Sequence, residues 1–106
     1  MPEIEYELAL DDTTLEWMRL SISTRGGSVV GFVVQYETTI DGRRVPVVRY
    51  DDHHGFAHRD VLNRRGDVVK KVRFDAAPLG VVATEARLDI FDNWPTYRAE
   101  FFKDTP

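Results

Sequence analysis

The side chains that could carry chemistry are concentrated in one short stretch, residues 48–60. Its thirteen residues include three His, three Asp and two Arg. A histidine exchanges a proton near neutral pH, and an arginine stabilises the charge that develops on a phosphate during cleavage. These residue types allow metal-free cleavage of a phosphodiester, with His54 and His58 as base and acid beside Arg49 or Arg59. The candidate catalytic residues are Arg49, Asp51, His54 and His58.

Two other hypotheses fit the same stretch. The spacing Asp-x-x-His-x-x-x-His of Asp51, His54 and His58 matches a two-histidine, one-carboxylate site for a divalent metal. This spacing crosses a predicted turn rather than lying on a helix, and no other cofactor is implied. Alternatively, the histidines and arginines bind a phosphate backbone or an acidic partner without any reaction. The sequence leaves all three hypotheses open.

The formal charge changes sign along the chain. The net charge at pH 7 is −4, but residues 41–73 carry a positive excess between two acidic flanks, and they contain all three histidines. This pattern predicts binding to RNA or single-stranded DNA that strengthens as the pH falls. The alternative is that the basic segment pairs with the acidic flanks after folding. The predicted nucleic-acid-binding residues are Arg59, Arg64, Arg65, Lys70 and Lys71.

Alternating polar and apolar residues predict strands through the first 74 residues. Ile4, Tyr6 and Leu8 alternate with glutamates, and the Val-, Phe- and Tyr-rich residues 28–39 place an apolar set on one face. Asp41-Gly42 is a strong signal for a two-residue hairpin turn. The predicted strands cover residues 3–8, 18–23, 28–39, 44–50, 56–62 and 68–74.

After Pro78 the apolar residues recur at helical spacing, from Leu79 through Ile90 and on to Phe101. Pro95 predicts either a kink in this helix or the start of a second short one. Packing the helix on one face of the sheet gives the predicted fold class, α+β. The expected architecture is an antiparallel meander of five to six strands with a C-terminal helix, kinked or split near Pro95.

The hairpin turn also predicts which way the candidate residues point. A two-residue turn at Asp41-Gly42 places Arg49 opposite Val34 and Asp51 opposite Phe32, on the apolar face. Burying an Arg and an Asp is costly unless they pair or line a cavity. A longer turn would reverse the alternation and place both in solvent. The sequence therefore allows a buried structural pair and a polar pocket equally. Pro46 indicates an edge strand or a bulge, because proline cannot donate to the ladder.

Composition bounds the remaining possibilities. The chain has 106 residues and no Cys, which excludes disulfides, thiolate metal sites and cysteine nucleophiles. Its apolar runs are shorter than the ~20 residues of a membrane span, and its first residues are acidic, unlike a signal peptide. We expect one cytoplasmic domain over residues 1–106, without membrane partners.

Residues 49–60 read Arg-Tyr-Asp-x-x-His-Gly-x-x-His-Arg-Asp, with Asp52-His53 and Phe56-Ala57 at the variable positions. This stretch resembles a signature of small, uncharacterised bacterial proteins and, more distantly, the TumE toxins of two-gene toxin–antitoxin modules. The resemblance covers about residues 30–75, with residues 89–94 as an extension. It carries over best at Arg49, Tyr50, Asp51 and His54, and then at His58.

The resemblance implies a toxin-like protein that acts on nucleic acid, such as a ribonuclease. It also implies a protein partner, an antitoxin with a helix-turn-helix domain. The alternative function is a non-enzymatic binding or assembly module, in which residues 49–60 are structural and an exposed strand edge mediates pairing. A homodimer is compatible with either function.

Overall fold

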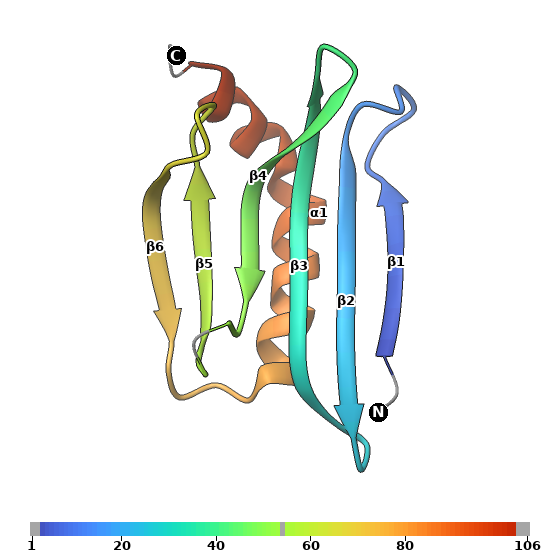
Figure 1. Cartoon of the computed structure of the whole chain (residues 1–106), viewed down its shortest axis with the longest axis vertical. Helices are drawn as coiled ribbons and strands as arrows, with labels where there is room; N and C mark the ends of the chain where they lie inside the picture. Colours follow the sequence, from blue (N-terminus) through green and yellow to red (C-terminus); the bar gives the residue numbers. More distant parts are fainter. Residues whose placement is uncertain (1–2, 54, 104–106) are drawn as a thin grey trace.

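In the part of the chain that the structure describes, six strands form one antiparallel sheet in which every strand pairs with its neighbour in the sequence, so that the sheet order is β1 to β6 (Figure 1). The computed structural model describes residues 3–53 and 55–103, so that His54 lies outside the described residues. The strands are β1 (Glu3–Ala9), β2 (Trp17–Arg25), β3 (Ser28–Ile40), β4 (Arg43–Asp51), β5 (Ala57–Leu62) and β6 (Val68–Phe74). The predicted meander is confirmed.

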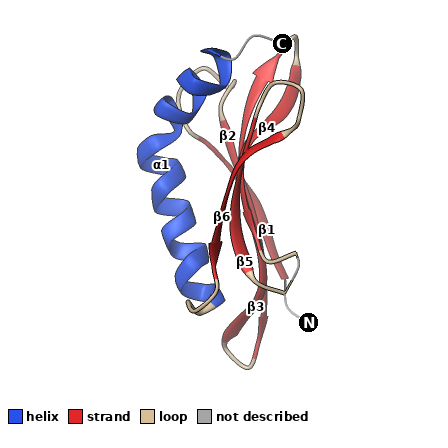
Figure 2. Cartoon of the chain, turned by 90° about the vertical axis from the view of Figure 1, so that its left-hand side faces the viewer, coloured by secondary structure: helices blue, strands red, loops and turns tan. Residues whose placement is uncertain are grey.

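The helix α1 (Leu79–Lys103) covers one face of the sheet (Figure 2). It packs mainly on β3, β4 and β5, and the predicted α+β class is confirmed. The core lies between the two layers, because the apolar face of the sheet meets the apolar stripe of the helix. The most buried core side chains are Met18, Val34, Tyr36, Val47, Val48, Val82, Ala86 and Ile90.

The helix continues across Pro95, so the second short helix that this proline allowed is not formed. Pro95 removes one backbone hydrogen bond from the helix interior. The buried residues Val82, Ala83, Ala86, Ile90 and Phe101 lie on both sides of it, and packing of this stripe on the sheet holds the two halves together. The described residues form no helix with both the length and the apolar character that a membrane span requires.

A β-bulge in β4 overturns the predicted orientation of Arg49 and Asp51. The two-residue turn forms, with Asp41 and Gly42 at positive φ, and Glu37 pairs with Pro46 as expected. The next pair joins Tyr36 to Val48, so Val47 is an extra residue in β4. The extra residue shifts the register by one, and Arg49 pairs with Gln35 instead of Val34.

The bulge therefore moves the side chains of Arg49 and Asp51 off the helix-covered side. Asp51 pairs with Val33 instead of Phe32, and its neighbour Tyr50 takes the place in the core. The signal was present in Pro46, which cannot donate to the ladder and marks the bulge in an inner strand.

Candidate functional site

The face of the sheet opposite α1, here called the open face, carries a chain of polar side chains from neighbouring strands. Register places Gln35, Arg49, Asp60 and Lys71 in one row across β3, β4, β5 and β6. Asp51 and His58 are paired in the next row. Side chains of paired residues point to the same side of a sheet, so these groups are neighbours although they are far apart in sequence.

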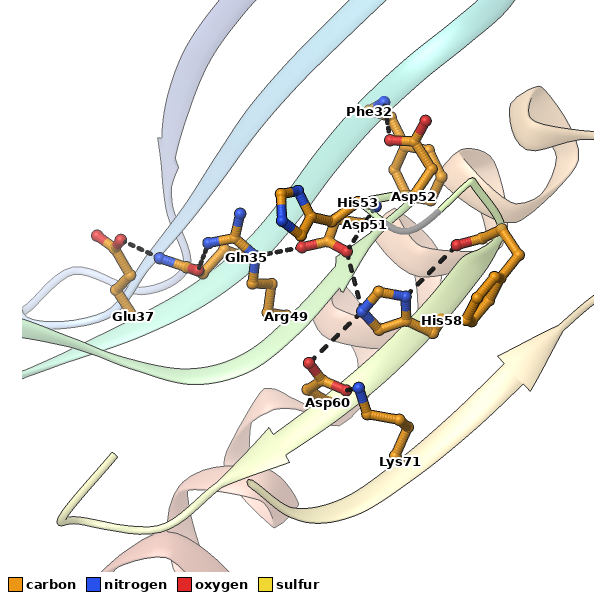
Figure 3. Close-up of polar contacts among 11 residues, drawn as sticks. Phe32, Gln35, Glu37, Arg49, Asp51, Asp52, His53, His58, Asp60 and Lys71 are labelled. Atoms are coloured by element: carbon orange, nitrogen blue, oxygen red, sulfur yellow. Dashed lines mark hydrogen bonds and ion pairs between the residues drawn. The ribbon is translucent and has the colours of Figure 1, made fainter. Parts of the chain in front are cut away.

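Asp51 is the centre of this chain, and two N–H donors and the ring of His58 converge on its buried carboxylate (Figure 3). The Nε of Arg49 donates to Oδ2 at 2.5 Å, and the backbone N–H of His53 donates to Oδ1 at 3.2 Å. The Nε2 of His58 lies 3.0 Å from Oδ1. Burial acts to raise the pKa of Asp51, but the hydrogen bonds from Arg49 and His53 and the nearby positive charge outweigh it. The pKa of Asp51 is therefore held below its ordinary value.

His58 is 2% exposed and is enclosed by partners. Besides Asp51, its Nε2 faces Oδ2 of Asp60 at 3.5 Å, and its Nδ1 lies 3.4 Å from the carbonyl oxygen of Phe56. Lys71 lies 3.4 Å from the other oxygen of Asp60. Both ring nitrogens of His58 thus face groups of the protein itself.

On the other side of Asp51, the chain of contacts continues to Gln35 and Glu37 of β3 (Figure 3). The Nη1 of Arg49 donates to Oε1 of Gln35 at 3.2 Å, and Nε2 of Gln35 donates to Oε2 of Glu37 at 2.6 Å. Glu37 is buried and is flanked by Arg19 at 3.2 Å and Arg44 at 3.7 Å. Acidic and basic side chains alternate along this chain except at Gln35, which bridges Arg49 and Glu37, so each carboxylate of the chain lies beside a base.

The bases of the predicted basic segment find acids in two places: Arg44 and Arg73 pair with the acidic flanks, as the alternative interpretation expected, whereas Arg49, Arg65 and Lys71 pair with acids of the segment itself. Arg44 forms a further ion pair with Glu7 of the acidic amino-terminal flank. Arg73 on the open face lies 2.8 Å from Asp75, and Arg65 in the β5–β6 turn lies 3.7 Å from Asp67.

The structure separates the other predicted residues from the Asp51 cluster. Register places Arg59 opposite Tyr50 on the helix-covered side, where its Nη1 donates to the hydroxyl of Tyr97 at 3.3 Å. Arg65 and Lys70 line a groove together with Arg59, whereas Arg64 lies over the ring of Phe102. Lys71 alone of the five lies on the open face beside Asp60.

A metal centre is not assembled among the described residues. Asp51 and His58 come together, but residues 3–53 and 55–103 contain no cluster of three potential ligands that could hold a metal ion. The third predicted ligand, His54, is outside this part of the chain. The Nε2 of His58, which a metal would need, faces two carboxylates.

On the helix-covered side, Asp89 collects three hydrogen bonds: from the hydroxyl of Tyr50 at 2.6 Å, from that of Tyr97 at 2.5 Å and from Nδ2 of Asn93 at 2.8 Å. Burial, together with donation to Asp89, raises the pKa of Tyr97 to about 12 and that of Tyr50 also well above its ordinary value. Both phenols therefore keep their protons at neutral pH, and Arg59 lies against them.

A family model described as a domain of unknown function, DUF7718, matches residues 1–105. The chain belongs to this family. No curated protein and no solved structure matches it. The DUF7718 match names no activity, so the resemblance to TumE toxins and the antitoxin partner stay predictions.

Sequence reasoning missed several members of these clusters in the DUF7718 chain. Gln35 and Glu37 were visible as polar residues at every second position of the most apolar strand, a pattern that indicates a polar face. Asp89, Asn93 and Tyr97 recur at helical spacing, which places them on one side of α1. Their contacts with β4 and β5 needed the tertiary fold.

Proposed function

We propose that this chain is a non-enzymatic assembly module that joins copies of itself, edge to edge, through β1 and β6. The observation that carries the proposal is the complementary patterning of the two edge strands. β1 is acidic on the open face and β6 is basic on the same face, while the other side carries Ile4, Tyr6 and Leu8 in β1 and Lys70, Val72 and Phe74 in β6.

The geometry of the Asp51 cluster favours this function over cleavage of nucleic acid. A general base must reach the proton that it abstracts, and His58 is buried with both ring nitrogens directed at protein groups. Arg49 is partly exposed, but its Nε is held by Asp51 and its Nη1 donates to Gln35. The cluster has the features of a structural network that fixes β3, β4 and β5 to one another.

At one edge of the sheet, β1 presents an uncovered and strongly patterned strand. Ile4 and Leu8 lie on the side that α1 occupies, yet they are 56% and 39% exposed because the helix packs farther along the sheet. Glu3, Glu5 and Glu7 alternate with them on the open face. An edge strand offers unpaired backbone groups to an incoming strand, and its side chains select which strand is accepted.

At the opposite edge, β6 has the matching pattern. Lys71 and Arg73 point to the open face, as their pairs Asp60 and His58 do. Val72 and Phe74 lie on the helix side. Apart from Lys70 on the helix side, β6 therefore has bases on one side and apolar residues on the other, which is the pattern that complements β1.

Charge decides which edges join. Two β1 strands side by side would place glutamates opposite glutamates, and two β6 strands would place Lys71 and Arg73 near their own copies. Pairing β1 of one copy with β6 of the next puts opposite charges together and apolar residues together. β1 and β6 run in opposite directions, so this pairing continues the antiparallel sheet (Figure 1). Such a head-to-tail contact generates a ring or a filament.

Sedimentation velocity of the full chain at increasing concentration tests the proposal, with two charge-swapped variants. Glu3→Lys/Glu5→Lys makes both edges basic. Lys71→Gln/Arg73→Glu replaces the two open-face bases of β6 by one carboxylate, so that the open face is acidic at both edges, and glutamine at position 71 avoids a second carboxylate beside Asp60. Arg43→Glu at the exposed β3–β4 turn is the control for charge change away from the edges. Thermal melts confirm that each variant is folded.

We expect wild type and the control to associate as concentration rises, and each swapped variant to remain monomeric. An equimolar mixture of the two swapped variants should associate again, because their edges are complementary. A wild type that stays monomeric at every concentration would overturn the proposal. So would swapped variants that associate alone as wild type does.

A further inference from the structure

We propose that the groove between β5, β6 and the second half of α1 binds a small amphipathic oxyanion: a carboxylate or a phosphate monoester that carries a short apolar chain. This site lies on the helix-covered side of the sheet and does not rest on the edge pairing proposed above, although β6 contributes to both. It uses Arg59, Arg65 and Lys70, three of the five residues that the sequence predicted to contact phosphate.

The groove has the size and the lining of a small-molecule site. Its volume is about 660 Å³, within the range usual for ligand pockets. One wall is apolar and comes from Val61, Leu62, Val69 and Phe101. The cationic side chains come from β5, from the β5–β6 turn and from β6. A ligand that matches both parts must combine a negative charge with an apolar body.

Arg59 provides a prearranged donor in this groove. Its Nη1 donates to the hydroxyl of Tyr97, which in turn donates to Asp89, so the guanidinium is held in place. Its Nε–H is buried and has no hydrogen-bond partner among the described residues. A buried donor without a partner is costly, and an oxyanion oxygen would satisfy it with a charge-assisted hydrogen bond.

The charges around the groove call for one anionic group rather than a polyanion. Lys70 and Arg65 lie at the rim, and the Arg65 charge is shared with exposed Asp67 at 3.7 Å. Glu100 also lines the groove and lies 3.8 Å from Lys103, while Asp89 stands behind the tyrosines. The tyrosine hydroxyls remain protonated at neutral pH and add no negative charge. The remaining positive charge is small.

The apolar wall also favours a compact chain over a nucleotide base. Phe101 is 3% exposed, so its ring face is not available for stacking. Tyr97 is held by Asp89 and Arg59. Single-stranded nucleic acid is bound through open aromatic faces beside a basic track, and this groove offers neither.

Nuclear magnetic resonance of the arginine Nε–Hε groups in ¹⁵N-labelled full chain tests the site. The probes are octanoate, octyl phosphate, 1-octanol and inorganic phosphate. We expect the Arg59 signal to move saturably with octanoate, octyl phosphate or both, which identifies the headgroup. Octanol and inorganic phosphate should each bind at least about tenfold more weakly, because octanol lacks the negative charge and inorganic phosphate lacks the apolar chain. A short single-stranded oligonucleotide is added as a further probe.

A matched pair of variants separates the groove from general charge. Lys70→Gln should weaken octanoate or octyl phosphate binding by roughly tenfold, as expected for losing one charged contact. Arg43→Gln, which removes a charge at the exposed β3–β4 turn, should leave it unchanged. The proposal is overturned if neither amphiphile moves the Arg59 signal, if octanol binds as tightly as octanoate, or if the oligonucleotide binds more tightly than both amphiphiles.

Discussion

Replacing Asp51 with asparagine keeps the shape of the side chain and removes its charge from the centre of the open-face network. The carboxylate is 6% exposed. It accepts hydrogen bonds from the N–H groups of Arg49 and His53, and it faces the ring of His58. Asparagine loses the charge-assisted bond to Arg49 and must point its own NH₂ group at a donor. Breaking a fully buried ion pair costs about 3–5 kcal/mol. Because Arg49 is 42% exposed and regains water, we expect a loss of about 2–3 kcal/mol.

The loss should also depend on pH, and urea titrations at several pH values measure it. The pKa of Asp51 is lower in the folded protein than in the unfolded chain, where an aspartate titrates near ~3.9. Its contribution is therefore complete well above pH ~4 and is lost as the pH falls through the folded-state pKa. The stability difference between wild type and Asp51→Asn should thus shrink in acid.

The matched control is Asp67→Asn, which removes an exposed carboxylate from the pair with Arg65. It should change the unfolding free energy by less than ~0.5 kcal/mol. If Asp51→Asn were no more destabilising than this control, the network would not hold the sheet together. A large loss that stayed constant into acid would instead show that the charge of Asp51 is not the source of the stability.

Three further predictions concern single side chains, each checked by denaturant or thermal unfolding. Arg49→Ala should lower the unfolding free energy by about 1–2 kcal/mol, a value between those of a surface ion pair and a buried one, because the Arg49 side chain is partly exposed to water. A loss above ~4 kcal/mol would contradict this partial exposure. Tyr36→Phe should cost about 1–2 kcal/mol by removing the 2.5 Å hydrogen bond to buried Glu16, and an unchanged midpoint would contradict it. Pro95→Ala should raise the melting temperature by restoring a helix hydrogen bond, whereas a fall would show that the proline ring is needed for packing.

Most of the fold could be predicted because it depends on local patterns. All six strands and the helix lie close to the ranges that apolar periodicity indicated, and Asp41-Gly42 forms the expected turn. The faces of β4 could not be predicted, because they depend on a single extra residue at Val47. Pro46 indicated a bulge or an edge, but alternation alone does not say at which residue the register shifts.

The candidate site was predicted in composition but not in arrangement. Arg49, Asp51 and His58 do come together, because β4 and β5 pair across a short connection. Arg59 follows His58 directly and therefore points to the other side of the sheet, because successive side chains of a strand point to opposite faces. Counting the charges of the segment does not take this alternation into account. The partners on β3 and α1 are distant in sequence, so only the tertiary fold brings them to the cluster.

The meander order of the sheet has a consequence for the chain during its synthesis. Each strand can pair with the previous one as soon as it leaves the ribosome, since no pairing waits for a later segment. The apolar side of the sheet, however, stays bare until α1 has been made. Translation of this 25-residue helix takes roughly 1–5 s at ordinary elongation rates. For that interval the nascent sheet exposes Val34, Tyr36 and Val48, and chaperones that recognise apolar surface would find their target there.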